Sequence, residues 1–387
     1  MDSITQASLG AAVGHLCWNK EIGAKALVAG AVLGTIPDLD ILVYPLLDQV
    51  QRLYWHRGES HSIFFVLLGG LATGLLLRRY CFREKLHLQK AFLGALLIYA
   101  THILIDLFTI YGTQLLAPFS RTGFGYGNFF IIDPLFTLAL LLGITGAIVF
   151  KSDWGRRLNI AGLAIASLYT IWSFSIQSVA DAKFNKSIAT LDVAITRQIT
   201  TAAPFTTFLW RHLAETPDGF VMAYWSVFDK PEKEIQFHYL PKQANVIEPV
   251  KRGRSFQVVE WFSKGWWCVI ESDEHSAKVV DLRFTEIPAA TQGSHLYWNW
   301  PFAWKFNLDP KDEVSLKAVV PDVQEPLEIL HLLAQRIRGG DGWLTPINRD
   351  QLASSAQLEE EASVSTTHTV KRLRNIIPIS LQIPNNS

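Results

Sequence analysis

The chain has 387 residues, of which 49% are hydrophobic and only 18% are charged, compared with about 25% charged residues in an average soluble protein. Its 35 basic and 35 acidic residues balance, and no long basic run or aromatic-basic stripe points to a nucleic-acid partner. The three cysteines form no CxxC pair, which argues against a cysteine-based metal site and against a disulfide framework.

Residues 1–182 predict a helical domain that crosses a membrane several times. The apolar segments in this half are Asp2 to Trp18, Ile22 to Leu47, Ser62 to Leu77, Leu88 to Ile110, Phe130 to Phe150 and Leu158 to Ala180. A helix needs about 20 residues to cross the hydrocarbon core, so we expect the last three to span, the third to be adequate and the first to be marginal. The second is broken at Pro37, because the following PDLD sequence cannot lie bare in lipid.

The distribution of Lys and Arg predicts the orientation of these segments. Two loops carry most of the positive charge, and the positive-inside rule makes both cytoplasmic. Their basic residues are Arg78, Arg79, Arg83 and Lys85 in one loop, and Lys151, Arg156 and Arg157 in the other. The loops at residues 48–61 and 111–129, and everything after the sixth segment, then face outward.

Residues 183–338 predict an extracytoplasmic, mainly β domain, so the fold class is a polytopic α-helical membrane domain followed by an α+β outer domain. Short β-type runs separated by Pro, Gly and charged turns support this: GFVMAYWSVF, EIQFHYL, SFQVVEWF, GWWCVIE and AKVVDLRF. We expect Asp181 to Thr200 to continue the last helix out of the membrane. Residues 339–387 are polar and predict a weakly ordered tail.

Ionisable residues at the membrane edge are costly and therefore candidates for function. In the apolar half they come from three separate parts of the chain: Asp38 and Asp40 in PDLD, His56 and His61 in HRGESH, and His102 and Asp106 in THILID. His102 and Asp106 stand at i and i+4, on one face of a helix. At about 1.5 Å rise per residue, all three groups reach a similar height near the outer edge of the membrane.

Imidazole and carboxylate together form a ligand set for Zn²⁺, or for a centre of Zn, Mn or Fe, whereas Ca²⁺ and Mg²⁺ seldom bind histidine. Six such groups fit two ions better than one tetrahedral zinc with an open position. His56 and His61 would not meet on a regular helix, but Gly58 between them allows a sharp turn. Each residue alone also has a structural explanation; Asp38, for example, could cap a helix. Their coincidence favours a metal site.

The motifs PDLD, HRGESHSI and THILIDLFTIYGTQLLAP, after an early Thr-Gln pair, resemble a family of membrane-bound, metal-dependent hydrolases that includes LexA-regulated inner-membrane proteins of bacteria. The resemblance implies an inner-membrane location and metal-site residues at Asp38, Asp40, His56, His61, His102 and Asp106. Many members have histidine where this chain has Gln6, a poor metal ligand that can still orient a water or a substrate.

These observations predict a membrane hydrolase with one or two divalent ions, zinc being favoured, acting on an amphipathic (phospho)ester at the outer boundary of the lipid bilayer. Glu59 is the candidate general base, although it could simply be an exposed loop residue, and Arg57 and Arg121 could hold a phosphate or carboxylate. Two alternatives stay open. One is a metal-ion transporter that uses the same ligands. The other is a membrane-anchored binding protein that uses the tryptophan-rich outer domain.

Overall fold

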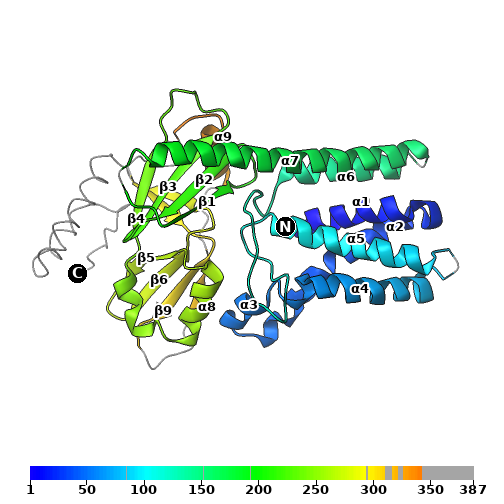
Figure 1. Cartoon of the computed structure of the whole chain (residues 1–387), viewed down its shortest axis with the longest axis horizontal. Coiled ribbons are helices and arrows are strands. Elements are labelled where there is room, and N and C mark those ends of the chain that lie inside the picture. The colour runs from blue at the N-terminus through cyan, green and yellow to red at the C-terminus, as the bar shows by residue number, and fades with distance from the viewer. Residues whose placement is uncertain are drawn as a thin grey trace, which may run out of the picture. The chain divides into compact units, whose positions relative to one another are not determined.

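A computed structural model of the chain describes residues 1–83, 85–150, 152–191, 193–292, 295–309, 316–320 and 326–341 (Figure 1). The described chain forms two compact units. Unit 1 comprises Met1–Ile176 with Ala202–Thr207, and unit 2 comprises Gln177–Thr201 with the described residues from Phe208 onward. The polar tail that the sequence predicts lies outside the described residues beyond position 341.

Unit 1 is helical. Its elements are α1 (Ser3–Ile22), α2 (Lys25–Thr35), the 3₁₀ helix η1 (Pro37–Leu46), α3 (Gln49–Trp55), the 3₁₀ turn η2 (Glu59–His61), α4 (Ile63–Leu76), the π turn η3 (Leu77–Cys81), α5 (Leu88–Leu107), α6 (Pro134–Val149) and most of α7 (Asp153–Ile188). In Figure 1, α1, α2, α4 and α5 run side by side as one bundle. The predicted helical domain with several apolar helices is therefore confirmed.

Three helices among the described residues are long and apolar enough to cross a membrane: Ile63–Cys81, Leu88–Leu107 and Asp153–Ile188. A fourth candidate is the pair α2 and η1, which bends by 45° between Thr35 and Pro37. The break therefore occurs where the sequence predicts it. Helix α6 has only 16 residues, fewer than predicted, because Asp133 caps its start through the backbone N–H groups of Leu135 and Phe136.

Helices α1 and α2 pack backbone against backbone through glycines. A Cβ added to Gly10 would lie 2.3 Å from the carbonyl oxygen of Gly30, and one added to Gly34 would lie 2.6 Å from that of Gln6. Small residues permit this approach between membrane helices. The contact fixes the C-terminal end of α2, and with it the start of η1, against the first turns of α1.

The segment between α3 and α4 contains the HRGESH motif and turns sharply. Its unusual residue is Arg57, which has a φ of 53°, in the left-handed region that non-glycine residues seldom adopt. The sequence suggests that Gly58 permits a sharp turn, but the structure shows that it is needed because there is no room for a side chain. A Cβ there would lie 2.9 Å from both Arg121 Nη1 and the Trp55 carbonyl oxygen.

Unit 2 contains antiparallel sheets, which confirms the predicted α+β fold. One sheet has the order β1 (Arg197–Ala202), β2 (Leu209–Glu215), β3 (Gly219–Ser226) and β4 (Phe237–Pro241). A second has the order β10 (Leu316–Val319), β9 (Ala303–Asn307), β6 (Ser276–Asp281) and β5 (Trp267–Ser272), and a third pairs β7 (Ile287–Gln292) with β8 (His295–Asn299). Helical elements are η4 (Ala244–Val250), α8 (Arg254–Ser263) and α9 (Pro326–Ile337).

Two local predictions in this region are wrong. SFQVVEWF forms helix α8 rather than a strand, and it buries Phe256, Val259 and Phe262 on one side. That spacing of three residues is helical, although the β-branched and aromatic content suggests a strand. The helix predicted over 181–200 ends at Ile188, and β1 begins at Arg197 because the residues from there pair with β2.

Candidate metal site

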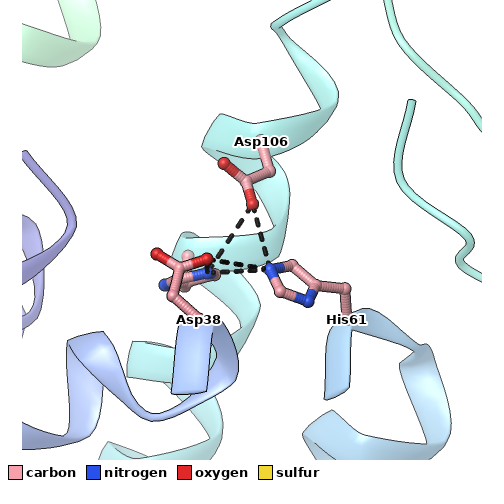
Figure 2. Close-up of side chains that lie close together, drawn as sticks. Asp38, His61 and Asp106 are labelled. Carbon is pink, nitrogen blue, oxygen red and sulfur yellow. Dashed lines mark hydrogen bonds and ion pairs between the residues drawn. The ribbon is translucent and has the colours of Figure 1, made fainter. Parts of the chain in front are cut away.

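Four of the predicted ligands converge at one end of the unit 1 bundle. Asp38 from η1, His61 from η2, and His102 and Asp106 from α5 each offer an atom that lies within 4.8 Å of the other three. Figure 2 shows the carboxylates of Asp38 and Asp106 directed toward the imidazole of His61. Chain segments far apart in sequence thus present two carboxylates and two imidazoles to one small volume.

The distances within this cluster are short. His61 Nε2 lies 3.2 Å from Asp38 Oδ1, 3.3 Å from Asp106 Oδ2 and 3.3 Å from His102 Nε2. His102 Nε2 lies 3.5 Å from Asp38 Oδ1 and 3.6 Å from Asp106 Oδ2. The two Nε2 atoms therefore face each other as well as the two carboxylates. A cation bound between the four groups would contact each of them in place of these direct contacts.

Burial makes this arrangement costly without such a cation. The side chains of His61 and Asp106 are completely buried, and that of His102 is 1% exposed. Asp38 is the most accessible member at 19% exposure. Buried charges in proteins are paired or coordinate metals, and access to the four-residue cluster is on the side of Asp38.

The two oxygens of the Asp106 carboxylate have different surroundings. Oδ1 accepts a hydrogen bond from Gln6 Nε2 at 3.0 Å, lies 3.2 Å from Arg57 Nη2 and pairs with the amino group of Met1. Oδ2 is buried and has no hydrogen-bond partner. Donors therefore saturate one oxygen, and the other is left facing His61 and His102, as a ligand atom for a metal would be. The residues present fit a divalent cation.

The other two predicted ligands form a separate pair beside the cluster. His56 Nδ1 lies 3.1 Å from Asp40 Oδ2, which also accepts a hydrogen bond from the backbone N–H of Arg57 at 2.9 Å. The same oxygen is 3.9 Å from His61 Nδ1. Asp40 and His56 thus border the four-residue cluster through His61, and neither belongs to it.

The predicted catalytic residues lie in two environments. Arg57 is 4% exposed, donates to Thr109 Oγ1 at 3.0 Å and stacks over the Tyr111 ring. Glu59 is 41% exposed on its side chain and forms a two-pronged ion pair with Arg121. Burial acts to lower the pKa of Arg121, but the ion pair with Glu59 outweighs it and raises that pKa. Arg57 therefore acts on Asp106, whereas Glu59 and Arg121 neutralise each other.

Sequence reasoning missed the groups that orient the histidines. His102 Nδ1 lies 2.7 Å from the carbonyl oxygen of Gly34, and His61 Nδ1 lies 2.9 Å from Ser60 Oγ. A backbone carbonyl has no signature in a sequence. Ser60 is visible in the sequence, but the usual partners of ligand histidines are carboxylates, backbone carbonyls and water, so its hydroxyl does not stand out as one.

Comparisons with known proteins place this bundle in a family. The model of the YdjM inner membrane protein family matches residues 1–180. The Escherichia coli (strain K12) inner membrane protein YbcI is 31% identical over 175 residues, which cover 97% of that protein and 40% of this chain. The chain belongs to the YdjM inner membrane protein family. The resemblance drawn from the motifs, to a family of inner-membrane proteins, is thereby confirmed.

For a second relative, the match covers a smaller share of the relative's own length. The uncharacterized protein YfhP of Bacillus subtilis (strain 168) is 29% identical over 151 residues, which are 37% of this chain and 45% of that protein. The chain thus matches less than half of the length of YfhP. No solved structure matches the chain. The YdjM match covers α1 to α6 and the first part of α7, including all the site residues described above.

Proposed function

We propose that this YdjM-family protein is an inner-membrane, metal-dependent hydrolase that binds its catalytic ion with Asp38, His61, His102 and Asp106. The observation that carries the proposal is the convergence of these four groups within 4.8 Å, together with the buried Oδ2 of Asp106, which has no hydrogen-bond partner. All four lie within the first turn or the last two turns of their helices rather than along the depth of a span. This gathering favours a fixed site over the transport pathway of the alternative hypothesis.

The mixed imidazole and carboxylate set favours Zn²⁺, with Mn²⁺ or Fe²⁺ as the other candidates. Four protein ligands leave no open position on one tetrahedral zinc. A catalytic site here therefore requires either a higher coordination number or a second ion, for which Asp40 and His56 are the adjacent ligands. A bound ion would lower the pKa of a water molecule and polarise the scissile group of the substrate.

The remaining residues have separable roles in this proposal. Arg57 and Gln6 hold Oδ1 of Asp106, which leaves its Oδ2 directed into the site. Glu59 is the proposed proton acceptor, but in this structure its carboxylate is held in an ion pair with Arg121. Its carboxylate must leave Arg121 before it accepts a proton, and the released guanidinium would then be available to an anionic group of the substrate.

An amphipathic (phospho)ester is the proposed substrate because the accessible side of the site is apolar. Exposed hydrophobic side chains lie between and after Asp38 and Asp40 along η1. These are Leu39, Ile41, Leu42, Val43 and Leu46. A lipid molecule could present its polar head to the carboxylates and histidines while its chains contact this apolar segment.

Metal content tests the proposal directly. Detergent-purified wild-type protein should contain Zn, Mn or Fe, and its thermal midpoint should rise when the ion is added, because a ligand at 100 times its Kd stabilises by about 2.7 kcal/mol. Asp38→Asn and His61→Ala/His102→Ala should lose both effects. Asp48→Asn is the matched control, since Asp48 caps α3 and asparagine caps equally well. Equal metal contents in all four proteins would refute the metal site.

Hydrolysis needs its own test, since a metal site alone is not an enzyme. The metal-loaded protein should cleave at least one member of a panel of phosphoester, ester and amide substrates that includes lipids, and Asp106→Asn should reduce that rate to background. Metal-loaded protein that cleaves no member of the panel faster than Asp106→Asn would leave the binding site intact and overturn the hydrolase.

The proposed orientation can be tested with cysteines. Cys81 is exposed at the end of η3, on the predicted cytoplasmic side, whereas Cys268 is buried. Glu274, on the β5–β6 turn of unit 2, is exposed and suits a cysteine substitution. In intact spheroplasts, an impermeant maleimide should label Glu274→Cys/Cys81→Ser and should not label wild-type Cys81. The reverse pattern would place unit 2 in the cytoplasm.

A further inference from the structure

We propose that Gln114 is a positioning residue of the metal site, which holds the His56–Arg57 turn so that its two side chains reach different parts of the site. The inference rests on the proposed metal-dependent function and deepens it. Gln114 lies in the loop between α5 and α6, well apart in sequence from the HRGESH motif, and it is 2% exposed.

The side-chain amide of Gln114 binds the motif from one side. Nε2 donates to the carbonyl oxygens of Tyr54 at 2.9 Å and His56 at 3.3 Å. Oε1 accepts from Arg121 Nη1 at 3.2 Å. Two carbonyls on one side and a guanidinium on the other allow only one orientation of the amide. Every hydrogen-bonding group of this side chain is therefore engaged with the motif or with Arg121.

The backbone around Gln114 binds the same segment. The N–H of Gln114 donates to the Arg57 carbonyl at 3.0 Å, and the carbonyl of Leu115 accepts from the N–H of Ile63 at 3.0 Å. The short stretch Gln114–Leu115 thus contacts both the start of the motif and the first residue of α4. Side-chain and backbone contacts together fix the segment from Tyr54 to Ile63 at both ends.

The turn needs this support because it is strained. Arg57 has a φ of 53°, and a non-glycine residue persists in that region only where its surroundings over-determine it. The strain has a structural result. Consecutive residues reach different carboxylates: His56 Nδ1 lies 3.1 Å from Asp40, and Arg57 Nη2 lies 3.2 Å from Asp106. Relaxation of the turn would move both contacts at once.

Substitutions at Gln114 separate this role from a general effect on stability. Gln114→Met keeps the length of the side chain and removes its hydrogen bonds. Gln114→Glu keeps an acceptor for Arg121 but places a carboxylate oxygen against the carbonyls of Tyr54 and His56. The matched control is Gln51→Met, which removes the capping box of α3, in the segment that leads into the motif, and touches none of the proposed ligands.

The probe is Co²⁺, whose visible absorption reports ligand geometry, titrated into the full-length, metal-stripped protein in detergent. Both Gln114 variants should bind Co²⁺ about 10- to 100-fold more weakly than wild type, as second-layer substitutions typically do, with a changed spectrum. Gln51→Met should retain the wild-type affinity and spectrum. In a background that carries both His56→Ala and Arg57→Met, Gln114→Met should add no more than about a threefold loss, because both contacts that it supports are then already absent.

The outcomes distinguish the two proposals. Wild-type protein that binds no Co²⁺, Zn²⁺, Mn²⁺ or Fe²⁺ overturns the metal-dependent function itself. Wild-type protein that binds Co²⁺, with Gln114 variants of unchanged affinity and spectrum, overturns the positioning role alone. Equal losses of Co²⁺ affinity in Gln51→Met and Gln114→Met also overturn it, and so does a full additional loss from Gln114→Met in the His56→Ala/Arg57→Met background. Either result would indicate a loss of stability rather than of ligand placement.

Discussion

Units 1 and 2 both bury charged side chains, but they compensate them differently. In unit 2, Arg211 lies 2.9 Å from Glu286 Oε2 and donates to the Leu282 carbonyl at 2.7 Å, while Tyr224 donates to Glu286 Oε1 at 2.7 Å. Both carboxylate oxygens have partners. In unit 1, Asp106 Oδ2 has no hydrogen-bond partner and faces the imidazoles of His61 and His102.

This difference separates a scaffold from a binding site. A buried ion pair whose lone pairs are all satisfied can hold elements of a fold together without any ligand. A buried carboxylate that keeps an oxygen without a hydrogen bond carries a desolvation cost that a bound cation would offset. By this criterion the Arg211 network is structural, although it is as deeply buried as Asp106, and the four-residue cluster is a candidate for cation binding.

The largest expected effect comes from breaking the closed network. Arg211→Leu leaves Glu286 buried and uncompensated, so unit 2 should lose about 3–5 kcal/mol of stability. Arg211→Leu/Glu286→Leu should be clearly less destabilised, because both charges are then absent. The stability of both variants is measured as the urea midpoint of unit 2, which is monitored in the full-length protein by the resistance of unit 2 to proteolysis. If folded Arg211→Leu protein lost its bound metal, the Arg211 network could not be purely structural, and the contrast with the four-residue cluster would be wrong.

Acid should also destabilise unit 2, through buried neutral histidines. Burial, assisted by the nearby Arg211, lowers the pKa of His212 from 6.5 to about 4, and burial alone does the same for His238. Below pH 6.5 the unfolded chain binds protons that the folded chain does not, so stability falls as the pH drops toward 4. Each histidine contributes at most roughly 3 kcal/mol. His212→Gln should reduce this slope in urea titrations, and an unchanged slope would contradict the assignment.

A smaller effect is expected where helix packing supports the candidate metal site. Gly10→Ala places a methyl group 2.3 Å from the Gly30 carbonyl, so it should cost about 1–3 kcal/mol and weaken Co²⁺ binding by displacing the end of α2. In Gly69→Ala the nearest atom is the Phe65 ring at 3.3 Å, so this control should be nearly neutral. If thermal midpoints and Co²⁺ affinities of the two variants coincide, the glycine contact does not support the site.

Much of the fold follows from hydropathy, because long apolar helices and short alternating strands leave strong patterns. The failures are local. In α8, the helical spacing of three buried residues is a weaker signal than the β-branched and aromatic content of the segment, which favours a strand. The start of α6 depends on Asp133, whose carboxylate stops the apolar run from extending the helix toward its N-terminus.

The candidate ligands could be selected from the sequence, because the rise per residue of a helix predicts a similar height in the membrane for all of them. Their division into a cluster and a neighbouring pair could not. Asp38 and Asp40 are two residues apart in a 3₁₀ helix, and at about three residues per turn they project in different directions. Only the tertiary structure shows that Asp38 meets His102 and Asp106, while Asp40 meets His56.

The contact between His102 and the Gly34 carbonyl has a chemical consequence of its own. A carbonyl oxygen can only accept, so the Nδ1 of His102 at 2.7 Å carries the proton. The neutral ring is then the Nδ1–H tautomer, in which the lone pair on Nε2 points at Asp38, His61 and Asp106. No side-chain substitution at position 34 deletes that acceptor. The tautomer of this candidate ligand therefore depends on how closely α2 approaches α5.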